Sequence, residues 1–153
     1  MNRLITILGP TATGKTALAA AVAYKIGGEI ISADSRQVFR GMDVGTGKDL
    51  ADYNVCGIAI PYHVIDICDP SEEYNAYRFM GDFVEAYDSI VSRGRVPIMC
   101  GGTGMYLDAV IRGYHLADAP IDESYRATLA PYSDAELTAR LASNISLHNH
   151  TDT

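Results

Sequence analysis

Residues 4–16 of the chain read LITILGPTATGKT, and this stretch decides the fold. The apolar, partly β-branched run Leu4–Leu8 is typical of a strand that is buried on both faces of a parallel sheet. The segment Gly9–Thr16 matches the pattern G-x-x-x-x-G-K-[ST] of a phosphate-binding loop, or P-loop. The Ala- and Leu-rich stretch Lys15–Ile26 predicts a helix that ends at a pair of glycines. Strand, loop and helix therefore follow one another in the order that this motif requires.

Strand and helix signals alternate further along the chain, up to about residue 112. The elements expected there are strands at Glu29–Ser32, Tyr62–Ile67 and Val96–Met99, an irregular loop over Gly41–Ala51, and helices from Ser71 to Arg93 and over Met105–Arg112. Ser71 is the candidate N-cap of the first of these helices. The alternation predicts an α/β fold of the P-loop NTPase-like kind, in which helices flank a parallel sheet.

The composition changes after Gly113. Residues 118–142 predict two short polar helices that are broken near Pro131, with Ser133 as a cap for the second. We therefore expect residues 1–114 to form a P-loop α/β core and residues 115–153 to form a separate helical segment.

Length and composition indicate a globular protein of 153 residues that needs no disulfide or structural metal to close its core. Its apolar runs are far shorter than the about 20 residues of a membrane-spanning helix. The first run ends at Gly9-Pro10 without the cleavage site of a signal peptide. Three cysteines without a CxxC pair favour a reducing compartment. These features predict a cytoplasmic protein that does not contact a membrane.

Charge is unevenly distributed along the chain. The net charge is −7, but residues 1–50 carry six basic and four acidic side chains. Overall acidity argues against a general nucleic-acid binder, because such affinity comes mainly from Lys and Arg. A local phosphate-binding surface is expected in the N-terminal third of the chain.

Each part of the predicted P-loop has a chemical role. The glycines let backbone N–H groups point inward to form an anion nest, and the helix N-terminus adds a partial positive charge. Lys15 supplies a full positive charge, and the Thr16 hydroxyl is placed to bind Mg²⁺. The residues expected to bind phosphate are Gly9, Pro10, Thr11, Ala12, Thr13, Gly14, Lys15 and Thr16.

Two polar clusters follow predicted strands, where open α/β sheets bind their ligands. Asp34 comes directly after the second strand; it could accept a proton from a nucleophile, hold a metal-bound water, or cap a helix. Thr103 follows the last strand; it could donate a hydrogen bond to a leaving-group oxygen, or cap a helix. The P-loop alone does not choose among hydrolases, kinases and other users of diphosphates.

Four segments carry a more specific signal. They are GPTATGKT at 9–16, GGEIISADSRQVFRGMDVGTGK at 27–48, YHVIDICDPSEEYNAYRF at 62–79 and VPIMCGGTGMYLDAVIRGY at 96–114. In this order they closely resemble the tRNA dimethylallyltransferases, also called tRNA isopentenyltransferases. The resemblance covers residues 3–114 and continues weakly to LHNHTDT at 147–153.

The resemblance implies a reaction. The dimethylallyl group of dimethylallyl diphosphate would pass to the exocyclic amino group of the adenosine just 3′ of a tRNA anticodon, and diphosphate would leave. The P-loop would hold the prenyl donor with Mg²⁺, not ATP. Asp34 matches the family's general base, Lys15 its diphosphate ligand, and Thr103 a residue that contacts the donor's bridging oxygen and the substrate. The tRNA contacts implied by position are Asp34, Ser35, Arg36, Gln37, Thr103 and Arg126.

Family members are about twice as long as this chain. We therefore expect it to correspond to their N-terminal half, with residues 115–153 as the truncated start of a helical, tRNA-binding insertion. We also expect it to act as a monomer. One alternative is a small-molecule or nucleotide kinase, which would need an Arg-rich lid and a strand that ends in a metal-holding Asp. The candidate strand is His63–Asp66, and no Arg cluster follows it. The other alternative is a non-catalytic module that binds diphosphates or nucleotides.

Overall fold

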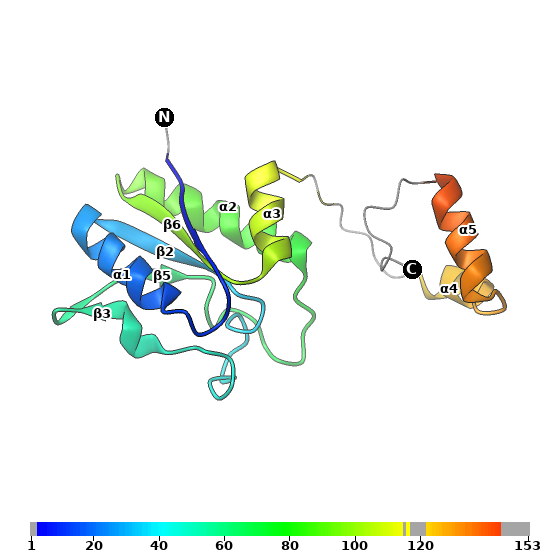
Figure 1. Cartoon of the computed structure of the whole chain (residues 1–153), viewed down its shortest axis with the longest axis horizontal. Coiled ribbons are helices and arrows are strands. Elements are labelled where there is room, and N and C mark those ends of the chain that lie inside the picture. Colours follow the sequence, from blue (N-terminus) through cyan, green and yellow to red (C-terminus); the bar gives the residue numbers. More distant parts are fainter. Residues whose placement is uncertain (1–2, 115, 117–121, 145–153) are drawn as a thin grey trace. The chain divides into compact units, whose positions relative to one another are not determined.

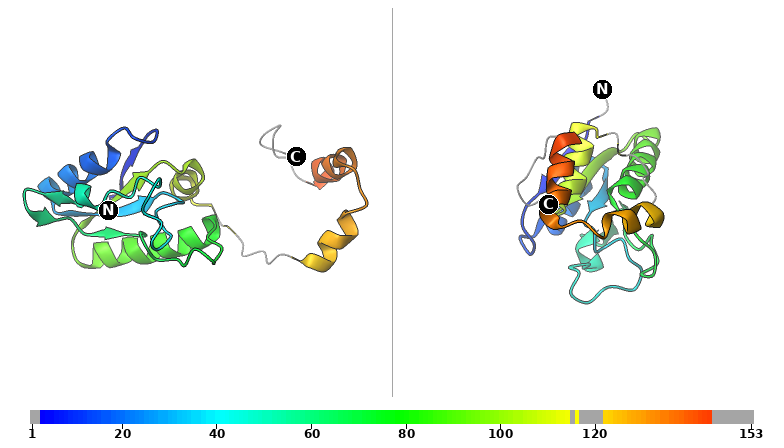
Figure 2. Two further views of the ribbon diagram at one scale, coloured as in Figure 1. Left: turned by 90° about the horizontal axis from the view of Figure 1, so that it is seen from below. Right: turned by 90° about the vertical axis from the view of Figure 1, so that its right-hand side faces the viewer.

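The computed structural model of the protein describes residues 3–114, 116 and 122–144. Four parallel strands form its main sheet. In spatial order the strands are β1 (Ile5–Leu8), β6 (Val96–Gly101), β2 (Gly28–Ala33) and β5 (Tyr62–His63). The helices that accompany them are α1 (Lys15–Ile26), α2 (Ala76–Ser92) and α3 (Gly104–Arg112) (Figure 1). The predicted α/β class is confirmed, and Figure 2 shows α1 and α2 on opposite faces of the sheet.

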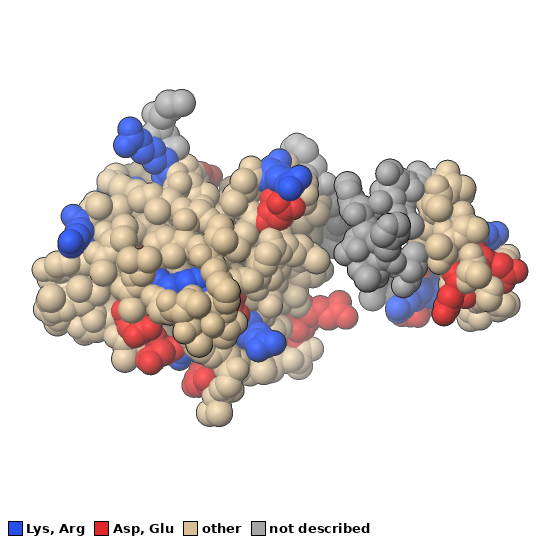
Figure 3. Space-filling model, viewed as in Figure 1, with Lys and Arg blue, Asp and Glu red and all other residues tan. Residues whose placement is uncertain are grey.

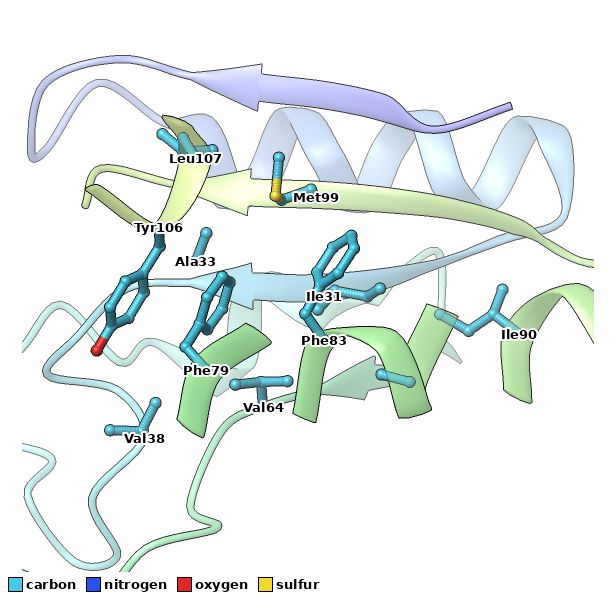
Figure 4. Close-up of a cluster of buried hydrophobic side chains, with 11 residues drawn as sticks. Ile31, Ala33, Val38, Val64, Phe79, Phe83, Ile90, Met99, Tyr106 and Leu107 are labelled. Carbon is cyan, nitrogen blue, oxygen red and sulfur yellow. The ribbon is translucent and has the colours of Figure 1, made fainter. Parts of the chain in front are cut away.

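Two apolar cores lie on the two faces of the sheet, because successive side chains of a strand point to opposite faces. On one face, Ile30 and Ile98 pack with three buried alanines of α1, whose small side chains suit a close approach of helix and sheet. The second core joins β2 and β6 to α2 and α3 (Figure 4). Its members include Ile31, Met99, Phe79, Phe83, Ile90 and Tyr106. The rings of Phe79 and Tyr106 stack there with their centroids 4.1 Å apart.

The first strand differs from the prediction. Leu4–Leu8 was expected to be buried on both faces inside the sheet, but β1 lies at the sheet edge and pairs with β6 alone among the described strands. Ile5 and Ile7 are half-buried, and Leu8 is 63% exposed. An apolar run shows only that a strand lacks polar side chains. Whether that strand has one neighbour or two depends on the strand order of the whole sheet.

Two further predictions are corrected by backbone conformation and capping. The strand expected over Tyr62–Ile67 stops at His63, because Val64 has a φ of +62°, outside the β region. The helix expected from Ser71 begins at Ala76, where the side chain of Asn75 accepts a hydrogen bond from the Arg78 N–H (2.9 Å). The N–H and hydroxyl of Ser71 instead donate to Asp69, which forms a local turn.

The segment between β2 and β5 contains structure that the sequence analysis did not predict. It forms the 3₁₀ helix η1 (Leu50–Tyr53) and an antiparallel hairpin of β3 (Asn54–Val55) and β4 (Ile58–Ala59). Asp49 caps η1 by accepting a hydrogen bond from the Ala51 N–H (3.1 Å). These elements are only two to four residues long, so hydrophobic periodicity cannot reveal them.

The chain divides into two units, Met1–Ala117 and Asp118–Thr153. The second unit contains α4 (Glu123–Leu129) and α5 (Asp134–Asn144), which confirms the predicted pair of short helices. Ser133 lies directly before α5, and its N–H and hydroxyl both donate to the carboxylate of Glu136. In the described part of the chain, no helix is long and apolar enough to cross a membrane.

A buried lysine holds the loop that follows β2. The side chain of Lys48 is 1% exposed, and its ammonium donates to the Asp66 carboxylate (2.6 Å), the Phe39 carbonyl (2.8 Å) and the Asp43 carboxylate (3.0 Å). Burial lowers the pKa of this ammonium, but its hydrogen bonds to Asp66 and Asp43 outweigh burial, so the pKa lies above its ordinary value. Lys48 is therefore charged at neutral pH, and all three of its N–H donors are used.

Two glycines of the central strands β2 and β6 leave no room for a side chain. A Cβ added to Gly28 would lie 2.8 Å from the carbonyl oxygen of Val96, and one added to Gly101 would overlap the backbone carbonyl group of Ala33. These two positions lie at opposite ends of the same strand pair. The contact at Gly101 sits at the carboxyl end of the sheet, where both strands lead into polar residues.

We expect Gly101→Ala to lower the free energy of unfolding by about 3 kcal/mol, because the strands would have to separate to admit the methyl group. Gly81 is the matched control. It lies within α2, a Cβ there would meet nothing within 4 Å, and an alanine should stabilise the helix by about 0.5–1 kcal/mol. Urea denaturation measures both changes. A Gly101→Ala variant as stable as the wild type would contradict the close contact.

We expect Lys48→Met to lower the free energy of unfolding by about 1–3 kcal/mol, because it leaves a carboxylate and a backbone carbonyl without their donor. The control is Lys25→Met. Lys25 is exposed in the last turn of α1 and makes no hydrogen bond or ion pair with the residues that the structure describes, so its loss should change stability by at most about 0.5 kcal/mol. Equal stability of the two variants would show that the Lys48 cluster does not hold the loop.

Candidate functional site

A cavity of about 190 Å³ opens at the carboxyl end of the sheet. Strands β1, β2 and β6 all end at this side, which is where open α/β sheets bind ligands. The cavity is lined by P-loop residues Thr11–Thr16, by Asp34 and Gln37 after β2, by Thr46, Gly47, Asp52 and Tyr53 of the next segment, and by Cys100 and Gly101 of β6 with the following Gly102. Residues 11–16, 34–53 and 100–102, which are far apart in the sequence, therefore contribute to one cavity.

The P-loop runs between β1 and α1. Gly14, the N-cap of α1, has a φ of +75° and supplies no capping side chain, so the first N–H groups of the helix are available to an anion. The Thr13 hydroxyl donates to the Pro10 carbonyl (2.8 Å), and the Lys15 ammonium donates to the same carbonyl oxygen. Lys15 and Thr16 are half-buried and line the cavity.

Asp34 lies directly after β2, and its half-buried side chain lines the cavity. Its carboxylate accepts a hydrogen bond from the Arg36 N–H (3.0 Å), which shapes the turn over residues 35–38. No helix follows at this point, so the alternative that Asp34 caps one is wrong. The Arg36 side chain is exposed and makes no hydrogen bond or ion pair within the described ranges.

Thr103 joins the ends of β2 and β6. Its hydroxyl accepts from the Ser35 N–H (2.9 Å) and donates to the Ser35 hydroxyl oxygen (3.3 Å), while its own N–H donates to the Ala33 carbonyl (3.1 Å). Thr103 occupies the N-cap position of α3, but its side chain makes no capping bond. The residue lies beside the cavity and is absent from the residues that line it.

Gln37 uses both ends of its side-chain amide inside the protein. The amide oxygen accepts from the Ser32 hydroxyl (3.0 Å), and the amide nitrogen donates to the Gly47 carbonyl (3.1 Å). Gln37 is buried and connects β2 to the loop that lines the cavity. Arg126 lies on α4 in the second unit, with its guanidinium 3.6 Å from the Glu123 carboxylate.

Cys100 and Tyr53 line the cavity, and no sequence pattern predicted either of them there. Burial raises the pKa of the Cys100 thiol to about 11; the charge of Lys15 lowers this pKa and that of Asp34 raises it. Burial likewise raises the pKa of the Tyr53 hydroxyl. Both groups are therefore neutral at pH 7. No sequence motif identifies these two residues, because both line the cavity only where β6 and the segment that ends η1 come together.

Asp66 ends the candidate metal-holding strand of the kinase alternative. Its carboxylate is bound to the Lys48 ammonium, and Asp66 is absent from the cavity lining. On the face of the first unit shown in Figure 3, basic side chains are scattered singly among acidic and uncharged ones. This face of the unit therefore carries no extended basic surface.

Comparison with known proteins identifies relatives of the chain. The sequence profile of the IPP transferase family matches residues 37–150, and that of the isopentenyl transferase family matches residues 2–55. A tRNA dimethylallyltransferase from Porphyromonas gingivalis is 58% identical over 149 residues, which are 97% of this chain and 49% of the relative. One from Phocaeicola vulgatus is also 58% identical and is covered over 48% of its length.

Solved structures show the same relationship. A full-length tRNA isopentenylpyrophosphate transferase from Bacillus halodurans superposes with a TM-score of 0.71 at 39% identity, over 94% of this chain and 48% of that one. A eukaryotic dimethylallyltransferase acting on tRNA superposes with a TM-score of 0.65 at 28% identity, over 92% of this chain and 38% of that one. The chain thus spans about half the length of the curated relatives it matches. Because the profile covers more than half of its residues, the chain belongs to the IPP transferase family.

Proposed function

We propose that the chain is part of an enzyme that transfers the dimethylallyl group of dimethylallyl diphosphate to the exocyclic amino group of the adenosine 3′ of a tRNA anticodon, with release of diphosphate. One observation carries the proposal: a single cavity brings the Lys15 ammonium and the α1 N-terminus together with the carboxylate of Asp34. This pairs an anion-binding end with a proton-accepting group. The relatives from Porphyromonas gingivalis and Phocaeicola vulgatus are named tRNA dimethylallyltransferases, which agrees with it.

The donor half of the site is the P-loop. Residues Thr11–Thr16 line the cavity. Backbone N–H groups of such a loop bind anions, and Lys15 adds a full positive charge. A departing diphosphate gains negative charge as the carbon–oxygen bond breaks, so cationic groups held in place before the reaction stabilise it. We assign Gly9–Thr16 to the diphosphate of the prenyl donor.

The acceptor half of the site is centred on Asp34. An adenine amino group is a poor nucleophile, and a positioned carboxylate that accepts its proton promotes attack on the allylic carbon. The base has to leave the stack of the anticodon loop to reach the cavity. Asp34, Ser35, Arg36, Gln37, Thr103 and Arg126 are the tRNA contacts that we propose.

These tRNA contacts differ in how free they are to bind. Arg36 is exposed and its guanidinium has no partner in the described residues, which suits a phosphate contact. Gln37 and Thr103 hold the site together through internal hydrogen bonds, so their contribution to tRNA binding would act through the positions of Asp34 and Ser35. The Thr103 hydroxyl is also the group proposed to contact the bridging oxygen of the donor.

The donor set of the cavity fits Mg²⁺. This ion takes oxygen ligands, keeps several waters, and binds protein through few groups together with substrate phosphates. The Thr16 hydroxyl lines the cavity, and it is the group that we propose as the protein ligand. Within residues 3–114, 116 and 122–144, no three His, Cys, Asp or Glu side chains form a metal cluster. When bound, the ion would help neutralise the diphosphate.

The two parts of the chain would have different functions. We propose that residues 1–114 carry the P-loop core and its chemistry, and that residues 115–153 begin a helical tRNA-binding segment, in a cytoplasmic enzyme that acts as a monomer. Arg126 and Arg140 are the basic residues of that segment.

We expect the wild-type chain to bind dimethylallyl diphosphate with Mg²⁺ in preference to ATP, and Lys15→Ala to weaken that binding by about tenfold or more, because it removes a charge-assisted contact with phosphate. Calorimetry measures both affinities. Lys25→Ala, which changes an exposed lysine outside the cavity, is the matched control and should bind as the wild type does. A preference for ATP would favour the kinase alternative.

We expect Asp34→Asn to retain donor binding but to lower prenyl transfer by about 10²–10⁴-fold, because the amide cannot accept the proton yet can still accept the hydrogen bond from Arg36. Labelled donor and tRNA report the transfer. Asp88→Asn, an exposed change on α2, serves as the control. Wild-type rates in Asp34→Asn would contradict the assigned base. A wild-type chain that binds the donor but turns over neither donor nor ATP would favour the non-catalytic module.

A further inference from the structure

Tyr53 lines the cavity, but it has no role in the reaction proposed for the P-loop and Asp34. It ends η1, is only 6% exposed, and lines the same space as Lys15, Thr16 and Cys100. Its hydroxyl makes no hydrogen bond with the residues that the structure describes. In those residues, no fully buried side-chain oxygen or nitrogen lacks a partner, so this hydroxyl must reach open space. The cavity is the space that the residue lines.

The ring of Tyr53 is held in one position. Its centroid lies 4.6 Å from that of Tyr62, and the ring belongs to the apolar core that includes Ala19 and Ala20 of α1. The Tyr53 carbonyl accepts a hydrogen bond from the Ile60 N–H (2.7 Å). These contacts fix the ring before any ligand binds, so the hydroxyl would be ordered without further entropic cost.

Whether the Tyr53 hydroxyl can donate a hydrogen bond depends on its protonation state. Tyr53 is neutral at pH 7, so its hydroxyl can donate a hydrogen bond to an anionic oxygen. The ring packs on α1, the helix whose N-terminus and preceding P-loop form the anion-binding end of the cavity. No described residue accepts a hydrogen bond from the Tyr53 hydroxyl, so a phosphate oxygen in the cavity could accept it.

We propose that the Tyr53 hydroxyl donates a hydrogen bond to a phosphate oxygen of the diphosphate bound at the P-loop, which makes Tyr53 a further phosphate-binding residue of the donor site. This inference rests on the proposed function in one respect, namely that the anion is the diphosphate of a prenyl donor. It adds a ligand from η1, on a segment 37 residues beyond the end of the P-loop motif at Thr16.

The test removes the hydroxyl alone. Tyr53→Phe keeps the ring, its contact with Tyr62 and its packing on α1. Calorimetry with Mg²⁺ should show about tenfold or more weaker binding of both inorganic diphosphate and dimethylallyl diphosphate, the loss expected for one hydrogen bond to a charged group. Because the hydroxyl has no internal partner, the melting temperature should stay within about 2 °C of the wild type.

Tyr62→Phe is the matched control. Tyr62 contacts the same ring but does not line the cavity, so its variant should bind both ligands as the wild type does. Tyr53→Phe affinities equal to the wild type would overturn the inference. So would a loss confined to dimethylallyl diphosphate, since that would place the hydroxyl against the prenyl group.

The outcomes separate this inference from the proposed function. If Lys15→Ala abolishes binding of the prenyl donor and Tyr53→Phe does not change it, the inference fails and the function stands. If Tyr53→Phe weakens inorganic diphosphate binding but the chain prefers ATP to dimethylallyl diphosphate, the phosphate contact stands and the function fails.

Discussion

The close pairing of β2 with β6 is the constraint on which the site depends. Gly101 lies so near Ala33 that a side chain is excluded between them, and the two strands therefore end at the same level. Asp34 follows one strand end and Thr103 the other, and the Thr103 hydroxyl then bonds to Ser35. A backbone contact between two strands thus sets the position of the carboxylate that faces the P-loop.

The cavity is lined by groups of opposite charge. The α1 N-terminus and the Lys15 ammonium favour an anion at one side, while the Asp34 carboxylate faces the same space from β2. Cys100, whose thiol is neutral, and Tyr53, whose hydroxyl is neutral, line the same cavity. Such a lining suits the proposed reaction, which needs an anion-binding group and a proton-accepting group in one space.

The wall formed by residues 41–53 has little regular structure, so side chains supply the partners that its backbone would otherwise lack. Gln37 donates to the Gly47 carbonyl, and Lys48 donates to the Phe39 carbonyl while pairing with Asp66. Both side chains are buried, which makes their loss costly and the loop well defined. These hydrogen bonds tie the loop to β2 and to the segment that follows β5.

The sequence by itself determined the α/β class, the exact bounds of α1, and the P-loop, because these depend on local periodicity and on glycines at set spacings. The placement of Asp34 at a strand end also followed from the order of the elements.

Only the tertiary structure decided that β1 is an edge strand, that Lys48 pairs with Asp66, and that Tyr53 reaches the P-loop cavity. The physical reason is that these facts depend on contacts between segments far apart in the chain, for which no local pattern is required.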